Sequence, residues 1–421
     1  MPRSPLGHII PRHAASTVRE ALADTRVVLV NGARQCGKST LVAQLGSERD
    51  AEMRSLDNAY ARQAAGDQPA DFVLSDKLLI IDEVQRDPEL LLSIKETVDA
   101  DPRPGRFLLT GSARILGLRT LPDTLVGRME TIELWPLSQG EIDGAPDGFV
   151  DAIFHHGPQL KHRSEEDRKG YVERVARGGY PDALVREGKR RTRFLRSYVS
   201  DLINRDVIQL AAISQADEMR ALVTMLADRS GQLIVPANIA ADLDISRWTV
   251  GRYLALLREV FLIKRIPAWR KRVGSRAVST AKTAFVDSGV ATSLLNLDTK
   301  ALSEVGGPLG PLLEGFVMME IARQLTWCEQ EVEMYHYRTR DKVEVDIVLE
   351  NARGQVVALE IKAGSTVRGD DFRGLRHLEE RLGEKFLVGA VLHTSQETMS
   401  FGPKMRAIPI AAIWETPSPK E

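Results

Sequence analysis

The stretch Arg26-Val-Val-Leu-Val-Asn-Gly-Ala-Arg-Gln-Cys-Gly-Lys-Ser-Thr40 decides the fold of the first third of the chain. Its first six residues are a β-branched apolar run that predicts a buried strand, and residues 39–45 predict a helix. Between them lies the pattern G-x-x-x-x-G-K-[ST]. Its glycines let the backbone N–H groups wrap around a phosphate, and the helix N-terminus adds partial positive charge. The sequence therefore predicts a phosphate-binding loop.

We expect this loop to bind ATP and Mg²⁺ as cofactors. Lys38 would reach the β- and γ-phosphates, and the Ser39 hydroxyl would ligate Mg²⁺. The predicted nucleotide-binding residues are Gly32, Ala33, Arg34, Gln35, Cys36, Gly37, Lys38, Ser39 and Thr40.

A second motif supports this interpretation. Leu78-Leu-Ile-Ile-Asp-Glu83 predicts a buried strand that ends in two carboxylates. At the carboxyl edge of a parallel sheet, Asp82 would lie beside the phosphate loop and hold Mg²⁺, and Glu83 would activate the attacking water. The two motifs together predict nucleotide binding, and the roles given to Asp82 and Glu83 predict ATP hydrolysis.

Two further residues are candidates for the same reaction. Thr110 ends the strand-like run Arg106-Phe-Leu-Leu-Thr110, where its hydroxyl could read the γ-phosphate or the attacking water. Arg128 follows a short helical stretch and could neutralise charge in the transition state, within its own chain or across a subunit interface. A surface salt bridge explains Arg128 equally well.

Composition restricts the class of protein. The 421 residues contain 57 Lys+Arg and 58 Asp+Glu, a net charge of −1, so any contact with nucleic acid must come from local basic patches. An apolar content of 43% is that of a globular protein. Two cysteines imply no disulfide framework, and the apolar runs are too short to span a bilayer. We expect a cytoplasmic protein that does not interact with membranes.

Residues 236–254 have the spacing of a helix-turn-helix, with Ser246 as the expected N-cap of the second helix. From Arg247 to Arg276 there are nine Lys and Arg against one acid, Glu259. This bias predicts phosphate contacts, so DNA is the expected partner. The predicted DNA-binding residues are Arg247, Trp248, Thr249, Arg252, Arg270, Lys271 and Arg272. The alternative is a packing module or protein interface with a charged rim.

Residues 186–205 are also basic, with seven cations and two acids. This pattern fits a solvated helix face, or an extension of a nucleic-acid track.

A set of carboxylates stands in the last third of the chain. Glu314 lies in a predicted helix, and Asp346 and Glu360 lie in two predicted strands joined by a turn at residues 351–354. Because side chains alternate along a strand, Glu360 and Lys362 share a face. Asp346, Glu360 and Glu314 could then hold a metal ion while Lys362 assists an attacking water.

The sequence resembles the AAA+ ATPases, and more narrowly the prokaryotic family that pairs an AAA ATPase core with a C-terminal domain of unknown function. The match is carried by Gly32–Thr40, Asp82–Gln85, Leu109–Ala113, Gly127-Arg128, Leu134–Ser138, Gly178–Pro181 and Phe285–Gly289. The resemblance implies an Mg²⁺-ATP site and, by analogy with AAA+ rings, a homo-oligomer.

The four residues Glu314, Asp346, Glu360 and Lys362 occupy positions similar to the signature of the PD-(D/E)xK nuclease fold. The order helix, strand, turn, strand also fits. This resemblance implies a metal-dependent nuclease site. The alternative is a nuclease-like fold that serves only as a binding scaffold.

The predicted fold is α/β in four parts. They are an AAA+-type parallel sheet at 1–140, a helical region at 141–232, a winged helix-turn-helix at 233–281 and a nuclease-like domain at 282–413, followed by a disordered tail at 414–421. Three functions are open. They are an ATPase that remodels or translocates on DNA, a nucleotide-dependent switch acting on a protein partner, and a DNA-binding regulator with slow ATP turnover.

Overall fold

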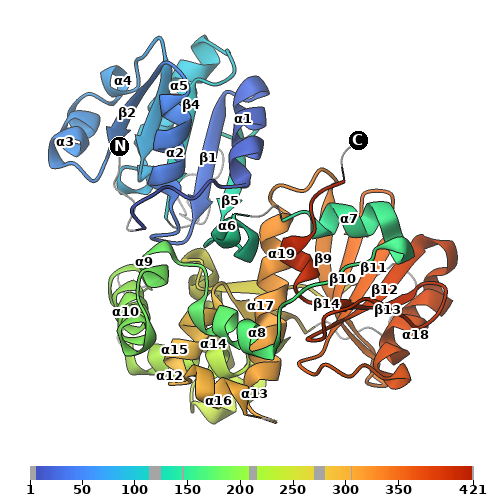
Figure 1. Ribbon diagram of the computed structural model, residues 1–421. Helices are drawn as coiled ribbons and strands as arrows, with labels where there is room; N and C mark the ends of the chain where they lie inside the picture. Colours follow the sequence, from blue (N-terminus) through green and yellow to red (C-terminus); the bar gives the residue numbers. More distant parts are fainter. Residues whose placement is uncertain are drawn as a thin grey trace. The chain divides into compact units, whose positions relative to one another are not determined.

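The computed structural model describes residues 6–112, 125–144, 147–207, 216–269, 280–304 and 306–419 (Figure 1). The chain forms two compact units. The first comprises Met1–Leu137 with Tyr180–Val185 and Glu259–Phe261, and the second comprises the remaining residues.

The first unit is built on a five-stranded sheet in the order β2-β3-β4-β1-β5. Its strands are β1 (Val27–Gly32), β2 (Ala51–Ser55), β3 (Leu78–Asp82), β4 (Phe107–Gly111) and β5 (Met129–Leu134). Every neighbouring pair is parallel, which confirms the predicted parallel α/β sheet. Strand β2 was not predicted, because its half-buried sequence at the sheet edge lacks an apolar run.

Helices connect the strands of this sheet, as parallel pairing requires. They are α2 (Lys38–Ser47), α3 (Ala59–Asp67), α4 (Pro69–Phe72) and α5 (Leu90–Ala100), with a short 3₁₀ turn at Val84–Arg86, and α1 (Ala14–Asp24) precedes the first strand. Strands β1, β3 and β4 are buried along their whole length, because helices cover the sheet and leave no side open to water. The short helix α9 (Pro181–Leu184) also belongs to this unit.

The strand order determines which residues can meet. Strand β4 lies between β1, which leads into the phosphate loop, and β3, which ends in Asp82. Because the three strands run parallel, their carboxyl ends share one edge of the sheet. Thr110 at the end of β4 is therefore placed between the phosphate loop and the two carboxylates.

The second unit begins with helices. They are α6 (Gln139–Asp143), α7 (Phe149–His156), α8 (Arg168–Arg177), α10 (Gly188–Asp201), α12 (Ala216–Asp228), α13 (Pro236–Asp242) and α14 (Arg247–Glu259), with a π-helical turn at Leu202–Val207. A three-stranded antiparallel sheet in the order β6-β8-β7 accompanies them, from β6 (Gln232–Leu233), β7 (Ile263–Ile266) and β8 (Lys282–Phe285).

The same unit ends in a six-stranded mixed sheet in the order β13-β14-β12-β11-β10-β9. Its strands are β9 (Val332–Arg338), β10 (Glu344–Asn351), β11 (Val356–Ile361), β12 (Phe386–His393), β13 (Met399–Ser400) and β14 (Met405–Pro409). Helices α15 (Ser288–Leu294), α16 (Thr299–Ser303), α17 (Leu309–Gln324), α18 (Arg373–Leu382) and α19 (Ala412–Glu415) complete it. The predicted hairpin is present, because β10 pairs antiparallel with β11.

The prediction of a disordered tail at 414–421 is wrong for the part that the structure describes. Trp414 belongs to α19 and is completely buried, with its ring 5.9 Å from that of Tyr171. Beyond it, the Thr416 carbonyl accepts a hydrogen bond from the Gly148 N–H at 2.8 Å. The polar, proline-containing sequence suggested disorder, but the adjacent tryptophan anchors this segment in the core.

Within the described ranges, no helix is both long and apolar enough to cross a membrane. Both cysteines, Cys36 and Cys328, are free thiols.

Candidate functional site

Glycines at two positions allow the backbone conformation of the phosphate loop. Gly37 has φ of 102°, and the neighbouring Gln35 also has a positive φ of 60°. At Gly32, a Cβ atom would lie only 2.0 Å from the carbonyl oxygen of Leu134 on β5. Glycine at 32 therefore permits close packing of the loop against the sheet, and glycine at 37 permits the left-handed turn into α2.

Lys38 is buried within the loop, with only 4% of its surface exposed. Its Nζ donates hydrogen bonds to the carbonyl oxygens of Gly32 at 3.0 Å and Ala33 at 2.8 Å. The ammonium is thus held at the loop, as expected for a residue that contacts phosphate.

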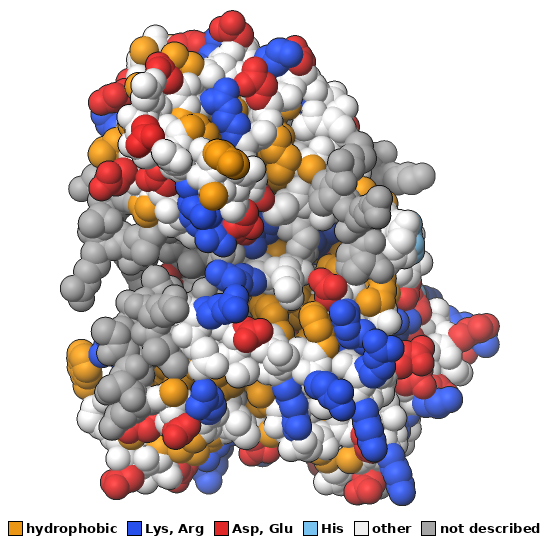
Figure 2. All heavy atoms as spheres, turned by 90° about the vertical axis from the view of Figure 1, so that its left-hand side faces the viewer, with side chains coloured by type: hydrophobic (Ala, Val, Ile, Leu, Met, Phe, Trp, Pro, Cys, Tyr) orange, Lys and Arg blue, Asp and Glu red, His pale blue; other side chains and the backbone are white. Residues whose placement is uncertain are grey.

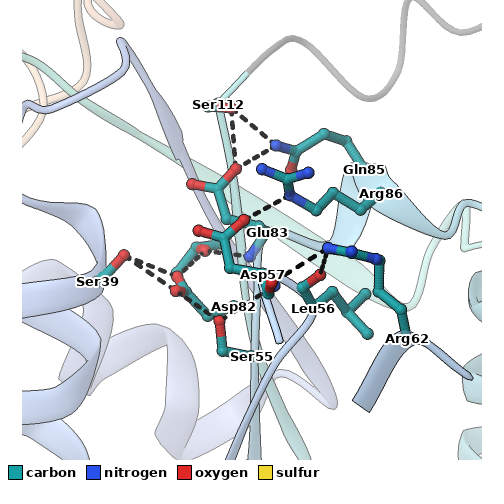
Figure 3. A network of polar contacts seen from close by, with 11 residues as sticks. Ser39, Ser55, Leu56, Asp57, Arg62, Asp82, Glu83, Gln85, Arg86 and Ser112 are labelled. Atoms are coloured by element: carbon teal, nitrogen blue, oxygen red, sulfur yellow. Dashed lines mark hydrogen bonds and ion pairs between the residues drawn. The ribbon is translucent and has the colours of Figure 1, made fainter. Parts of the chain in front are cut away.

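Asp82 connects the loop to the sheet. Its carboxylate accepts hydrogen bonds from the Ser39 hydroxyl at 2.9 and 3.1 Å (Figure 3). It also accepts one from the Thr110 hydroxyl at 2.6 Å. The structure therefore brings together the two residues predicted to hold Mg²⁺. A hydroxyl and a carboxylate supply the oxygen ligands that Mg²⁺ prefers, so this pair fits the ion.

Thr110 does not occupy the predicted position of a γ-phosphate sensor. Its side chain is completely buried, its one hydroxyl hydrogen goes to Asp82, and its oxygen accepts the Glu83 N–H at 2.9 Å. The hydroxyl thus donates its hydrogen to Asp82 and accepts the backbone N–H of Glu83. Thr110 is thus placed to orient Asp82 and Glu83, and it does not line the cavity described below.

Glu83 has a left-handed backbone with φ of 61°, which is uncommon for a non-glycine residue. Its carboxylate accepts hydrogen bonds from the Ser112 hydroxyl at 3.0 Å and from the Gln85 side-chain amide (Figure 3). Gln85 also donates to Ser112 at 2.7 Å, which closes a three-residue ring of hydrogen bonds. This ring fixes the direction of the Glu83 carboxylate.

A cavity of about 270 Å³ lies against the loop within the first unit. Loop residues form its polar wall together with Glu83, Arg12, Gln44 and Asp182, and apolar side chains form the rest of the lining. The apolar lining residues outside the loop are Leu6, Ile9, Ile10, Leu41, Leu137 and Pro181. A polar wall beside an apolar wall suits a ligand that has phosphates at one end and a flat ring at the other.

The N-terminal segment is tied directly to the phosphate loop. Arg12 donates hydrogen bonds to the carbonyl oxygens of Cys36 at 2.8 Å and Trp135 at 2.6 Å. Through these bonds the residues before α1 become part of the pocket wall.

Arg128 is not at this edge of the sheet. The β1–β5 register pairs Val27 with Met129 at the amino end and Gly32 with Leu134 at the carboxyl end. A strand of this length separates the two ends by roughly 16 Å. Arg128 instead pairs with Asp99 on α5 at 3.0 Å. Arg128 is therefore far from the nucleotide site of its own chain. The surface salt bridge that the sequence also allowed is present, and a role across a subunit interface stays a prediction.

The structure describes only some of the predicted DNA-binding residues. Arg247, Trp248, Thr249 and Arg252 belong to α14, whereas Arg270, Lys271 and Arg272 lie outside the described residues. Ser246 accepts the Thr249 N–H at 3.0 Å, as predicted for the N-cap. Trp248 is 73% exposed, and the Arg252 guanidinium lies 5.7 Å from its ring centre. Val250, Tyr253 and Leu257 form the buried side of the same helix.

The predicted metal ligands Glu314, Asp346 and Glu360 do come close together, but a lysine stands among them. Lys282 on β8 places its Nζ 2.7 Å from Asp346, 3.2 Å from Glu344 and 3.7 Å from Glu314, and its side chain is only 2% exposed. Lys362 forms a separate pair with Glu360 at 2.8 Å.

The structure therefore does not support the predicted metal site at Glu314, Asp346 and Glu360, which stays a prediction. Among the described residues, no group of three or more His, Cys, Asp or Glu side chains is placed to hold a metal ion. The physical reason is that the Lys282 ammonium already supplies the positive charge. The second oxygen of Asp346 is also occupied, since it accepts the Ile361 N–H at 2.9 Å.

The carboxylates still outnumber Lys282 and Lys362, and this excess of negative charge helps to raise the pKa values of the carboxyl groups. Burial and the charge of Asp346 raise the pKa of Glu314 to about 8 and the pKa of Glu360 to about 7. Burial alone would lower the pKa of Lys282, but the surrounding carboxylates outweigh it and raise that pKa above its ordinary value. Lys282 therefore remains charged at neutral pH.

Comparison with known proteins gives two close relatives. They are the uncharacterized proteins Rv2008c of Mycobacterium tuberculosis and Mb2031c of Mycobacterium bovis, each 30% identical over 360 residues. The match covers 84% of this chain and 74% of each relative. The chain belongs to their family. A protein of Haemophilus influenzae is 25% identical over 223 residues, which is 52% of this chain and 51% of that protein.

Three domain models describe this family in the chain. Residues 24–143 match an AAA domain, residues 168–301 match a domain of unknown function (DUF8612), and residues 309–413 match another (DUF4143). The first match supports the AAA part of the expected resemblance and a nucleotide-binding ATPase domain at residues 24–143. The description of the third gives no function, so it does not confirm a nuclease.

Solved structures with similar chains include AMPPCP-bound DnaA from Aquifex aeolicus and a mutant of RuvB from Thermotoga maritima. DnaA is 16% identical with a TM-score of 0.31, and the match covers 61% of this chain and 91% of the DnaA chain. RuvB is 18% identical with a TM-score of 0.29, and the match covers 63% of this chain and 93% of the RuvB chain. Scores this low are below the level at which whole chains share a fold.

Sequence reasoning missed several residues of the AAA-domain site and of the acidic cluster. The apolar wall from Leu6 to Ile10 is recognisable only once the chain folds back on the loop. Gln85 and Ser112 stood inside the quoted motifs without an assigned role. Lys282 did leave a signal, because a lysine inside the apolar run Ala281-Lys-Thr-Ala-Phe-Val286 must find a buried partner.

The raised carboxyl pKa values predict how stability depends on pH. Between about pH 5 and pH 8 the folded chain binds more protons than the unfolded chain at Glu314, so this group's contribution to stability is lost as the pH rises. We expect Glu314→Gln to be more stable than wild type at about pH 8 and to differ little at about pH 5. Urea unfolding at both pH values measures this. Glu384→Gln, at an exposed site, is the control, and an equal gain in that variant would contradict the prediction.

Lys282→Met should lower the free energy of unfolding at about pH 8, the opposite of the effect of Glu314→Gln. It leaves buried carboxylates without their counter-ion, which costs about 3–5 kcal/mol of unfolding free energy for a buried pair. The loss should be smaller at about pH 5, where Glu314 and Glu360 are protonated. Thermal unfolding at both pH values tests it, and an unchanged melting temperature at pH 8 would show that Lys282 is not the counter-ion.

Proposed function

We propose that this member of the AAA-domain family hydrolyses ATP with Mg²⁺ at the carboxyl edge of its first sheet and couples the reaction to DNA held by α14. The observation that carries the proposal is the hydrogen-bonded set in which Asp82 joins Ser39 of the loop to Thr110 of the neighbouring strand. This set combines the polar groups of a phosphoryl-transfer site with a cavity of suitable chemistry beside it.

Each residue has a definite task in this proposal. Lys38 and the loop N–H groups bind the β- and γ-phosphates, and Ser39 and Asp82 hold Mg²⁺. When bound, the ion neutralises charge on the phosphates. Glu83 orients a water toward the γ-phosphorus and accepts its proton as the bond to the ADP oxygen breaks. Thr110, Gln85 and Ser112 keep the two carboxylates in place, and the apolar wall at Leu6, Ile9 and Ile10 covers the base.

Arg128 fits this scheme only in a homo-oligomer. Its position at the amino edge directs it away from its own nucleotide, so a neighbouring copy would have to present it. A ring of copies is one arrangement that does so. This part of the proposal requires that ATP turnover depend on the assembly of several copies of the chain.

DNA is the partner that best fits α14. The exposed face of this helix presents Arg247, Trp248 and Arg252, while its opposite face packs in the core. A second helix after a turn, capped by Ser246 and followed by the β7–β8 hairpin, suits a winged helix-turn-helix that places its N-terminal residues in the major groove.

A switch that acts on a protein is the second candidate, because Trp248 is a large apolar side chain in solvent. In either case we assign the C-terminal sheet the role of a scaffold, because the Lys282 ammonium neutralises the carboxylates that would otherwise attract a metal ion. Turnover that DNA stimulates favours the first candidate, and turnover indifferent to DNA favours the second.

Substitution of Glu83 separates nucleotide binding from hydrolysis. Glu83→Gln should retain ATP binding and lose roughly 10²–10⁴-fold in kcat, the usual contribution of a general base. Lys38→Ala should lose binding itself. Steady-state phosphate release and titration with a fluorescent ATP analogue measure the two quantities. Glu96→Gln on the exposed side of α5 is the control, and a Glu83→Gln variant with full turnover would remove Glu83 from the mechanism.

The role of α14 is tested with DNA. Trp248→Ala and Arg252→Ala should each weaken binding to duplex DNA by about 1–3 kcal/mol and reduce any stimulation of ATP turnover. Basal turnover without DNA should not change. Fluorescence anisotropy and the ATPase rate with single-stranded, duplex and branched DNA are the measurements. Binding that both substitutions leave intact would favour the protein-directed switch.

A further inference from the structure

Helix α10 carries an unusual concentration of positive charge. Its 14 residues contain five cations and a single acid, Asp201 at the last position. The cations are Lys189, Arg190, Arg191, Arg193 and Arg196.

Two of these five cations have structural tasks. Arg196 donates to the carbonyl oxygen of Ser293 at 2.8 Å, which ties α10 to α15. Arg191 is half-buried near the carboxylates of Glu187 and Asp287, and burial lowers its pKa.

The other three have no such task. Lys189, Arg190 and Arg193 are exposed, and none forms an ion pair with a described residue. Other surface cations of the chain do pair, as Arg19 does with Glu48 at 2.9 Å and Arg220 with Asp217 at 2.8 Å.

This arrangement disfavours the folded helix. The first turn of α10 contains no acid, and the carboxylate of the N-cap Glu187 lies near Arg191, so the positive end of the helix dipole disfavours Lys189 and Arg190 with only this one acid to offset it. Lys189 and Arg193 are four residues apart, which brings like charges onto neighbouring turns. A ligand that carries several negative charges would reverse both effects.

The same face continues with a hydroxyl group. Lys189, Arg193 and Ser197 recur at four-residue spacing and are all exposed, so they form a stripe along one side of the helix. Figure 2, which shows the face on the left-hand side of Figure 1, has many Lys and Arg side chains on the lower part of the surface. Cations and hydroxyls are the groups that bind DNA phosphates without reading bases.

The apolar residues of α10 exclude the other common anionic partner. Leu195, Tyr198 and Val199 are buried, and the Arg186 guanidinium covers the Phe194 ring at 4.2 Å. A helix that lies on a membrane needs an exposed apolar face to insert, and α10 offers none.

We propose that Lys189, Arg190 and Arg193 form a second DNA-contact surface that binds backbone phosphates independently of sequence. The inference rests on the proposed DNA function, which α14 would serve by reading bases. Since α10 and α14 belong to the same compact unit, one duplex or two segments of it could engage both.

The test uses the full-length protein and a triple variant, Lys189→Ala with Arg190→Ala and Arg193→Ala. Anisotropy titrations with two duplexes of unrelated sequence, over a series of KCl concentrations, should show an equal loss of affinity for both. The slope of log K against log salt should become shallower by roughly two to three, since each phosphate contact contributes about 0.9. The matched control removes the same charge elsewhere in the unit, at the exposed Lys161, Arg353 and Lys385.

The outcomes separate this inference from the function on which it rests. If the wild type binds no DNA, the proposed function fails and this surface fails with it. If the wild type binds and the triple variant matches the control, only this inference is overturned. A loss confined to one of the two sequences would also overturn it, because that is base reading.

Two further readouts distinguish DNA contact from a role in folding and from membrane binding. The triple variant should melt at the wild-type temperature or above, because it loses repulsion and no ion pair. A lower melting temperature together with lost binding would assign the residues to folding and overturn the inference. Binding to phosphatidylserine vesicles that the triple variant loses, with DNA binding unchanged, would overturn it in favour of a membrane.

Discussion

The carboxylate of Asp82 accepts hydrogen bonds from Ser39 at 2.9 Å and from Thr110 at 2.6 Å, and the rest of the nucleotide site is arranged around it. These two bonds join the start of α2, the end of β3 and the end of β4. They are possible only because β4 lies between β1 and β3 in the sheet. Thr110 also accepts the Glu83 N–H, so the same strand order fixes the backbone of the proposed catalytic glutamate.

A different constraint governs the acidic cluster of the second unit. Carboxylates gathered in a poorly solvated site repel one another, and the chain resolves this with an ammonium group from β8 and with raised carboxyl pKa values. The PD-(D/E)xK-like residues are close in space, as their spacing predicts, and Lys282 adds an ammonium group among them that the spacing did not predict. A similar pattern of residues does not guarantee a similar function when a neighbouring element contributes one further charge.

The first unit was largely predictable because its signals are local. A glycine pattern between a buried strand and a helix, and an apolar strand ending in Asp82 and Glu83, depend on residues next to one another in sequence. Strand β2 and the apolar wall at Leu6, Ile9 and Ile10 were not predictable, because neither has a local signal. The role of Thr110 was not predictable either, since its hydroxyl hydrogen can be assigned only once both of its neighbours are placed.

The sequence by itself determined the phosphate loop, the parallel sheet of the first unit, the hairpin of β10 and β11 and the cap of α14. Each follows from backbone geometry and from side-chain spacing within a single element. Tertiary structure alone decided that Arg128 lies at the far edge of the sheet, that Trp414 anchors the C-terminal segment and that Lys282 stands among the carboxylates. These facts depend on which distant segments pack together, and a buried charge or ring finds its partner only in the folded chain.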